Sequence, residues 1–337
     1  MIISRERLRL LLTASAVVIA PLFASVAHAW GPGGHRVTAD VAYEQLSPTA
    51  RTKCVEILRK HPEFKKRFDD RMPADVRKAG EEAENRWIFL QAAIWPDLIR
   101  PYPPYHHESW HYINIPLYLS PHDQAVLQGT VKPNISLVVP SPLTGGKDSL
   151  NCVQAFKLSV DQLEAADSTD EERAVALCWI LHIGGDIHQP CHSTALMTRG
   201  RFYTAEGDRG GNKIKVKQSG NLHRLWDGLL GGEQPLNDIR GRTTAILADT
   251  ELLKAGQDAA TKIDIADWLN ESQQLAKTFV YSDLILDTVR KGEADPSHNL
   301  PSIDIPESYL KDAGRHAQRR VCQAGFRLAK VLEKAID

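Results

Sequence analysis

Two His-x-x-x-Asp pairs in this sequence have the residue types and spacing for metal chemistry. His182 and Asp186 form one pair in LHIGGDIHQPCH, and His223 and Asp227 repeat the spacing in NLHRLWDG. On an α-helix, residues i and i+4 share a face, so each pair can hold one ion. One pair arises easily by chance among 13 histidines, but two pairs, with His192 beside the first, indicate a metal site. Imidazole and carboxylate ligands without thiolate favour catalytic zinc, which keeps positions open for water.

The first pair encloses two consecutive glycines, Gly184 and Gly185. Each glycine costs about 1 kcal/mol in the interior of a helix. We therefore expect another backbone or a metal cluster to approach this helix so closely that side chains are excluded there.

Two further segments contain candidate ligands in ordinary local sequence. Asp97 follows a Trp-Pro pair in IWPDLIR, with Arg100 three residues later, and His111 lies between aromatic residues in SWHYINIP. Taken alone, Asp97 is most simply a surface carboxylate and His111 a core histidine.

The N-terminal segment adds an unusual candidate. A basic start, an apolar run and an Ala-His-Ala ending predict that residues 1–29 are a secretory signal peptide, with an uncleaved membrane anchor as the alternative. Cleavage after Ala29 would leave no membrane anchor and would give Trp30 a free α-amino group. That nitrogen can chelate a metal together with the carbonyl oxygen of Trp30, and His35 can close on the same ion. Trp30 could instead serve only as an aromatic packing residue.

Helical patterns dominate the elements that must position these residues. The predicted helices cover residues 33–46, 48–60, 83–95, 149–166, 170–188, 240–255, 264–290 and 306–335. Prolines and glycines make 101–148 an irregular excursion, and turn residues followed by alternation predict a short β-hairpin at 207–217. The predicted fold class is therefore mainly α, a single helical domain with a small β-hairpin.

Composition narrows the functional classes. A formal net charge of −1 argues against a passive nucleic-acid coat, which would be basic. Any phosphate-bearing partner must therefore be held locally, by metal ions or a few arginines. Five cysteines in a chain bound for an oxidising compartment allow up to two disulfide bonds, whose pairing stays open. They are Cys54, Cys152, Cys178, Cys191 and Cys322.

The motifs taken together resemble those of the secreted zinc-dependent nucleases of the S1/P1 type. The resemblance covers residues 30–337 and is carried, in order, by WG…GH, WPDLIR, WHYINIP, LHIGGDIHQPCH, GGNKIKV and NLHRLWD. It implies one zinc-dependent nuclease domain over these residues. It also implies a mainly helical, three-zinc architecture like that of zinc-dependent phospholipase C.

The resemblance implies a set of nine ligands for three Zn²⁺ ions. The implied ligands are Asp97, His111 and His182 for the first zinc; Trp30 and His35 for the second, with Asp186 bridging the two; and His192, His223 and Asp227 for the third. His188 matches no ligand position, and we expect it to support the ligands instead of binding metal.

The implied activity is hydrolysis of single-stranded RNA and DNA to 5′-phosphorylated products, accompanied by 3′-nucleotidase activity. The predicted signal peptide indicates a secreted or periplasmic protein, and a monomer is the default expectation. We expect zinc to activate water for in-line attack on phosphorus, with Asp97, Arg100 and Asp186 as catalytic residues. Tyr112 matches the position of a base-stacking residue. Asn114 matches a base contact that is aspartate in some fungal members, so base preference does not carry over.

Two other classes of protein fit parts of this pattern. A zinc-dependent phospholipase C shares the N-terminal Trp and three zinc ions, but it has a longer gap before its first His and a Glu as its last ligand. Here the gap from Trp30 to His35 is five residues and the last ligand is Asp227. A secreted binding protein with structural zinc would close each site with four protein ligands and would need no processed N-terminus.

Overall fold

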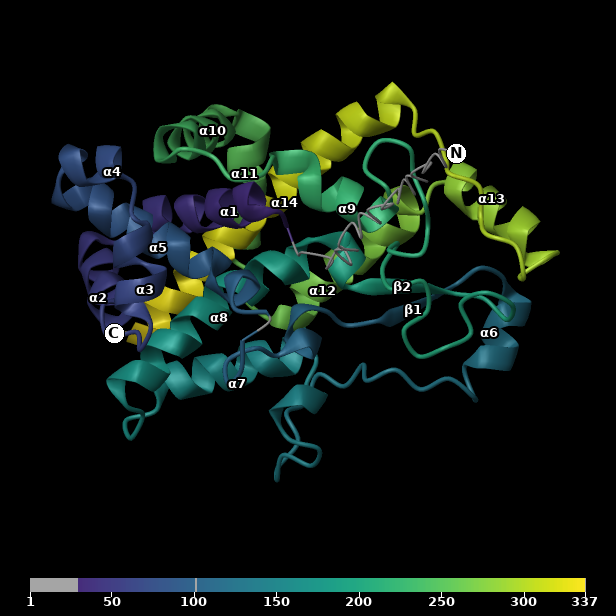
Figure 1. Cartoon of the computed structure of the whole chain (residues 1–337), viewed down its shortest axis with the longest axis horizontal. Coiled ribbons are helices and arrows are strands. Elements are labelled where there is room, and N and C mark those ends of the chain that lie inside the picture. Colours follow the sequence, from purple (N-terminus) through teal and green to yellow (C-terminus); the bar gives the residue numbers. More distant parts are fainter. Residues whose placement is uncertain (1–29, 101, 337) are drawn as a thin grey trace, which may run out of the picture.

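The computed structural model describes residues 30–100 and 102–336, so the predicted signal peptide, residues 1–29, lies outside the described residues. Helices pack around a central one, and a small sheet lies to one side (Figure 1). The helices are α1 (Pro32–Gln45), α2 (Pro48–Leu58), α3 (Phe64–Arg67), α4 (Ala74–Ala79), α5 (Glu81–Leu98), α6 (Pro121–Leu127), α7 (Cys152–Glu164), α8 (Asp170–His188), α9 (Leu222–Asp227), α10 (Leu236–Ala248), α11 (Thr250–Ala259), α12 (Ile265–Leu275), α13 (Asp283–Glu293) and α14 (Glu307–Ile336). The strands are β1 (Ile115–Tyr118) and β2 (Thr194–Met197). The predicted fold class, a single, mainly helical domain, is confirmed, although its small β element is a parallel pair of strands and not the predicted hairpin.

The central helix is α8, whose predicted bounds are confirmed. Thr169 caps its N-terminus in a capping box with Glu172, as the sequence STDEE indicates. Every residue from Ala176 to His188 is buried, because α8 packs against α5, α7 and α14 and also contacts α1, α2 and α12. The last turns of this helix therefore lie at the centre of the molecule.

The other predicted helices agree with the structure in part. Those for α1, α2, α5, α7 and α14 are confirmed to within a few residues at each end. The single helix predicted at 240–255 is two helices, because the side chain of Asp249 caps the N-terminus of α11. The helix predicted at 264–290 is interrupted by a π-helical turn, Ala276–Val280. Among the described residues, no helix has the length and apolar character needed to cross a membrane.

The β-hairpin predicted at 207–217 is wrong. Residues 207–213 form consecutive turns, because three of their glycines adopt positive φ angles that a strand excludes, and Val216 makes only an isolated parallel bridge to Ile303. The sheet pairs β1 with β2 in parallel, with Ile115 opposite Thr194. Just before the sheet, the backbone N–H of Ile113 donates to the carbonyl oxygen of His192 at 2.8 Å. The sheet therefore holds two segments that carry predicted site residues side by side.

The prediction of disulfide bonds is also wrong. All five cysteines lie among the described residues, and all are buried free thiols. Each packs separately into the core: Sγ of Cys322, for example, donates to the carbonyl oxygen of Leu252 at 3.2 Å. Burial raises the pKa of Cys54 and of Cys322 to about 12, so these thiols behave as small apolar groups.

A buried ionic network joins the end of α8 to α12 and α14. Glu271 accepts hydrogen bonds from Nη2 of Arg327 at 2.7 Å and from Nη1 of Arg320 at 2.6 Å. Nη1 of Arg327 also lies 3.0 Å from Nε2 of His188. His188 therefore faces α14 and not the predicted ligands, since it lies two residues past Asp186 and projects from another face of the helix.

Replacing Glu271 with Gln should lower the free energy of unfolding by about 2 kcal/mol, because two buried guanidinium groups lose their carboxylate. Burial raises the pKa of Glu271, but Arg327 and Arg320 outweigh burial and lower it from 4.5 to about 2. A lowered carboxyl pKa stabilises the fold above the unfolded value, and this stabilisation is lost as pH falls towards the folded value. The melting temperatures of wild type and E271Q, followed by circular dichroism, should therefore converge as pH falls from about 4.5 to about 2.

Glu251→Gln is the matched control, because Glu251 pairs with Arg315 at an exposed site. This change should alter the free energy of unfolding by less than about 0.5 kcal/mol at any of these pH values. A difference between wild type and E271Q that stays constant with pH would contradict the role given to the Glu271 carboxylate.

Candidate metal centre

Eight of the predicted metal ligands contribute side chains to three buried clusters among the described residues. The clusters are His35, His182 and Asp186; Asp97, His111 and His182; and His192, His223 and Asp227. Within each cluster the candidate ligand atoms lie within 4.8 Å of one another. They come from α1, α5, α8, α9 and two short 3-10 helices, Glu108–His111 and Pro190–His192, so only the folded chain brings them together. Each cluster can bind a metal ion.

The carboxylate of Asp186 links the first two clusters. Its Oδ2 lies 3.2 Å from Nδ1 of His111 and 3.3 Å from Nε2 of His182. Its Oδ1 lies 3.4 Å from Nε2 of His35, on the other side. Burial, and then the negative charge of Asp97, raises the pKa of Asp186 well above its ordinary value. A positive charge on each side would stabilise the ionised carboxylate, so the arrangement suits two cations.

The third cluster shows most directly that its donors fit a cation. Nδ1 of His192 donates to the carbonyl oxygen of His111 at 2.5 Å, and Nδ1 of His223 donates to that of Gly210 at 2.8 Å. These carbonyls select the tautomers with a lone pair on Nε2, and the two Nε2 atoms face each other at 2.9 Å. Burial lowers the pKa of His192 well below its ordinary value, so its Nε2 stays unprotonated. Oδ2 of Asp227, 3.6 Å from Nε2 of His223, completes a set that a metal ion would satisfy.

The two glycines of α8 make room for neighbouring side chains. A Cβ atom on Gly185 would lie 2.9 Å from Nδ1 of His35, whose ring stacks on that of His182 with centroids 4.0 Å apart. A Cβ atom on Gly184 would lie 2.5 Å from Cδ2 of Leu328. Close approach therefore explains both glycines, but the approaching groups are the side chains of Leu328 and of the candidate ligand His35, and not another backbone.

The first described residues are fixed beside the clusters. Trp30 is completely buried, and its Cδ1 would lie 3.7 Å from a Cβ atom on Gly185. The backbone N–H of Gly31 donates to the carbonyl oxygen of Asp227 at 2.8 Å. The chain therefore begins α1 between the central helix and the third cluster, while the predicted cleavage site lies at the edge of the described residues.

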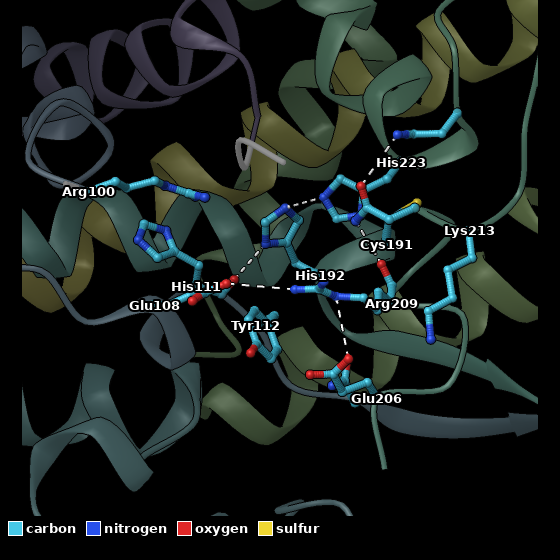
Figure 2. Close-up of a pocket in the computed structure, with 13 residues that line it drawn as sticks. Arg100, Glu108, His111, Tyr112, Cys191, His192, Glu206, Arg209, Lys213 and His223 are labelled. Atoms are coloured by element: carbon cyan, nitrogen blue, oxygen red, sulfur yellow. Dashed lines mark hydrogen bonds and ion pairs between the residues drawn. The ribbon is translucent and has the colours of Figure 1, made fainter. Parts of the chain in front are cut away.

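Two of the clusters border a cavity of about 450 Å³, to which they contribute His111, His192 and His223 (Figure 2). The predicted catalytic residue Arg100 also lines this cavity, as do Tyr112 and Asn114. Nε and Nη2 of Arg100 lie 2.9 and 2.8 Å from Oδ1 of Asp97, which orients the guanidinium group. The fold thus brings the predicted substrate-binding residues and the candidate metal ligands to one place.

Several residues on the wall of the cavity were missed by sequence reasoning. They are Glu108, Cys191, Glu206, Arg209, Asn212, Lys213 and Asn221. Most belong to the turn 206–213. The alternating apolar and basic residues after the glycines of this segment predict a hairpin and not a turn. One sequence signal could have identified them: basic residues stand next to the glycines of this turn. Basic side chains in a loop beside a metal site are well placed to bind an anion.

Asp208 anchors this turn. Its buried carboxylate accepts hydrogen bonds from the backbone N–H groups of Leu196 and Gly211 and from the hydroxyl of Tyr281, each at 2.9 Å. Burial raises the pKa of Asp208 to about 7 despite these donors. The anchored turn presents the carbonyl oxygen of Gly210 to the third cluster, so the turn and the cluster share one framework.

Comparison with known proteins gives the chain relatives. Residues 30–337 match the family S1/P1 Nuclease. Endonuclease 4 of Arabidopsis thaliana is 24% identical over 281 residues, which are 79% of this chain and 83% of that protein. Nuclease S1 of Aspergillus oryzae is 29% identical over 172 residues, which are 47% of this chain and 53% of that protein. Endonuclease 3 of Arabidopsis thaliana is 45% identical over 58 residues, 16% of each chain.

Replacing Gly185 with Ala should remove at least one bound metal ion per chain, because the added methyl group collides with His35. The metal content of the dialysed protein, measured by mass spectrometry, tests this. Gly314→Ala is the matched control, since a Cβ atom at this position of α14 meets no atom within 4 Å. The control should keep its full metal content and gain about 0.5–1 kcal/mol in free energy of unfolding. Equal metal content in the two variants would contradict the packing described for His35.

Proposed function

The chain belongs to the S1/P1 nuclease family and is a phosphodiester hydrolase, and we propose that it cleaves single-stranded RNA and DNA to 5′-phosphorylated products. We propose that the same site also removes the phosphate of 3′-nucleotides. The observation that carries this proposal is the three buried His/Asp clusters, two of which line one cavity together with the guanidinium group of Arg100.

We propose that the clusters hold three Zn²⁺ ions. Imidazole and carboxylate donors without thiolate suit zinc at a catalytic site. Oδ2 of Asp97 and Oδ1 of Asp186 are buried acceptors without a hydrogen-bond donor in the described part of the chain, as expected for metal ligands. The proposed ligands are Asp97, His111 and His182; Trp30 and His35, with Asp186 shared; and His192, His223 and Asp227. When bound, the ions supply a water molecule of lowered pKa and Lewis-acid stabilisation of the phosphate.

Arg100 is the residue of the chain that we propose to act directly on the phosphate. Its guanidinium group lines the cavity and is held by Oδ1 of Asp97. A planar group fixed in this way can donate to two phosphate oxygens and stabilise the charge that grows on them and on the departing 3′ oxygen. Asp97 would thus have two roles: it would bind the metal ion, and it orients the guanidinium group of Arg100.

Tyr112 and Asn114 are proposed to bind the base. Both line the main cavity and an adjoining one of about 200 Å³, so they lie where a nucleotide next to the clusters would reach. A base must leave its stack to lie against the ring of Tyr112, which explains a preference for single strands. The amide of Asn114 offers both a donor and an acceptor to the base edge.

We propose that removal of residues 1–29 during secretion, or export to the periplasm, completes the second zinc site. The new α-amino nitrogen of Trp30 would join its carbonyl oxygen and the ring of His35 on one ion. Two contacts support this: Trp30 packs against Gly185, and its neighbour Gly31 is tied to the backbone of Asp227.

The purified, zinc-loaded protein should cleave a single-stranded oligonucleotide at least tenfold faster than the same sequence in a duplex, because unpairing a base costs a few kcal/mol. Mass spectrometry should find a 5′ phosphate on the products.

Asp186→Asn should lower kcat at least about 100-fold, since one carboxylate serves two clusters. Asp258→Asn, at an exposed pair with Lys254, is the matched control. Hydrolysis of phosphatidylcholine without cleavage of nucleic acid would overturn the proposal.

A protein that keeps Ala29 in front of Trp30 should bind one zinc ion fewer and lose most of its activity, because its α-amino nitrogen is in a peptide bond. Zinc content and nuclease rate are measured on the extended protein, and again after an aminopeptidase has removed the extra residue. The trimmed sample is its own control and should recover both properties. Three zinc ions and full activity in the extended protein would show that the Trp30 amine is not a ligand.

A further inference from the structure

Arg209 has an unusual backbone for its residue type. Its φ angle is +59°, and it is the one non-glycine residue with positive φ in the described part of the chain. This conformation costs an L-residue with a side chain about 1 kcal/mol or more. Gly207, Gly210 and Gly211 on either side have positive φ as well, so glycine would be the ordinary choice at position 209 too. An arginine in this conformation, where glycine would fit without strain, suggests a task for its side chain.

The turn holds Arg209 rigidly. The carboxylate of Asp208 accepts a hydrogen bond from the backbone N–H of Gly211 within the turn. The backbone N–H of Arg209 donates to the carbonyl oxygen of Glu206 at 2.9 Å. A Cβ atom on Gly207 would lie 2.7 Å from the carbonyl oxygen of Leu196, so the turn lies directly on β2. A rigid support lowers the conformational entropy lost when the guanidinium group binds a ligand.

The guanidinium group of Arg209 lies between two carboxylates at the mouth of the cavity (Figure 2). Nη2 lies 3.7 Å from Oε1 of Glu108, and Nε lies 3.6 Å from Oε2 of Glu206. All three side chains are about half exposed, at 49%, 62% and 54%. Long, exposed ion pairs of this kind contribute about 0–1 kcal/mol, so a stronger anion can displace them.

The position of Arg209 fits a phosphate next to the one that is cleaved. It shares a cavity wall with Tyr112, the proposed base-stacking residue. The carbonyl oxygen of Gly210, the next residue, accepts a hydrogen bond from Nδ1 of His223 in the third cluster. Arg100 already lies by Asp97 at another part of the cavity, so Arg209 is a second cation for a second phosphate group.

We propose that Arg209 binds a phosphodiester of the substrate strand beside the scissile one, and that Glu108 and Glu206 hold this arginine until the strand displaces them. The inference rests on the proposed nuclease function and deepens it. A guanidinium group donates to two phosphate oxygens at once, which the long pairs with the two carboxylates do not match. The same carboxylates repel a phosphate that does not reach Arg209. The site therefore selects strands with a second phosphate over substrates that carry only one.

The test compares a single-stranded pentanucleotide with a dinucleoside monophosphate, both cleaved by the zinc-loaded full-length mature protein. Arg209→Gln should lower the ratio of their kcat/KM values about tenfold, as expected for one lost charge-assisted phosphate contact. It should also reduce the salt dependence of pentanucleotide binding by about 0.7 in the logarithmic slope, the loss of one phosphate contact. Glu108→Gln alone should raise the ratio of the kcat/KM values two- to threefold. The same change added to R209Q should leave that ratio unchanged.

Lys215→Gln is the matched control, because Lys215 lies close by in the same segment, is exposed and does not line the cavity. It removes one positive charge and should leave the ratio unchanged. A fall of both kcat/KM values together in R209Q, or the same fall in K215Q, would overturn the proposal. Anisotropy of a labelled phosphorothioate pentanucleotide, which resists cleavage, separates the two proposals. Binding of this probe that depends on Arg209, with no cleavage of the unmodified pentanucleotide, would support the phosphate contact and refute the nuclease function, and absence of binding would refute both.

Discussion

The rest of the structure depends on one constraint: histidine ring nitrogens with unshared electron pairs are buried facing one another. Nε2 of His192 and Nε2 of His223 are held 2.9 Å apart, while their Nδ1 atoms are committed to backbone carbonyls. His182 is aimed in the same way, by the carbonyl oxygen of Ala93 at 2.7 Å from its Nδ1. Grouping acceptors in this way is unfavourable without a cation, so the packing of the whole domain must hold them in place. Binding of a metal ion at these clusters would therefore be coupled to folding.

The packing of helix α8, which is buried on all sides, fixes the positions of these ligands. One face carries His182 and Asp186 to the clusters, and the glycine between them lets His35 approach. The end of the helix is fixed through His188 to the ionic network of Glu271 on the opposite side. A shift of α8 by a fraction of an ångström would change both ends at once. The ligand geometry is thus a property of helix packing and not of a local motif.

How much could be predicted from the sequence depended on the range of the interaction. The i, i+4 pairs His182/Asp186 and His223/Asp227 lie on α8 and α9 as their spacing predicted, because a helix fixes that geometry locally. The glycines at 207–217 were misread as part of a hairpin, because φ angles in a turn are set by contacts with distant residues such as Tyr281. Free thiols could not be predicted either, since composition does not say which cysteines the core keeps apart. Asp97 and His111 looked ordinary because their partners are distant in the sequence.

The distribution of charge explains how a nearly neutral chain can bind a polyanion. The formal net charge is −1, and the carboxylates of Asp97, Asp186 and Asp227 repel one another in the interior, where they favour cations. The basic residues of the cavity, Arg100, Arg209 and Lys213, lie on its wall. Attraction at short range then depends on a few oriented guanidinium and ammonium groups and on any ions that the clusters bind, not on the charge of the whole surface. Such a site discriminates by the geometry of successive phosphates, which a uniformly basic surface does not do.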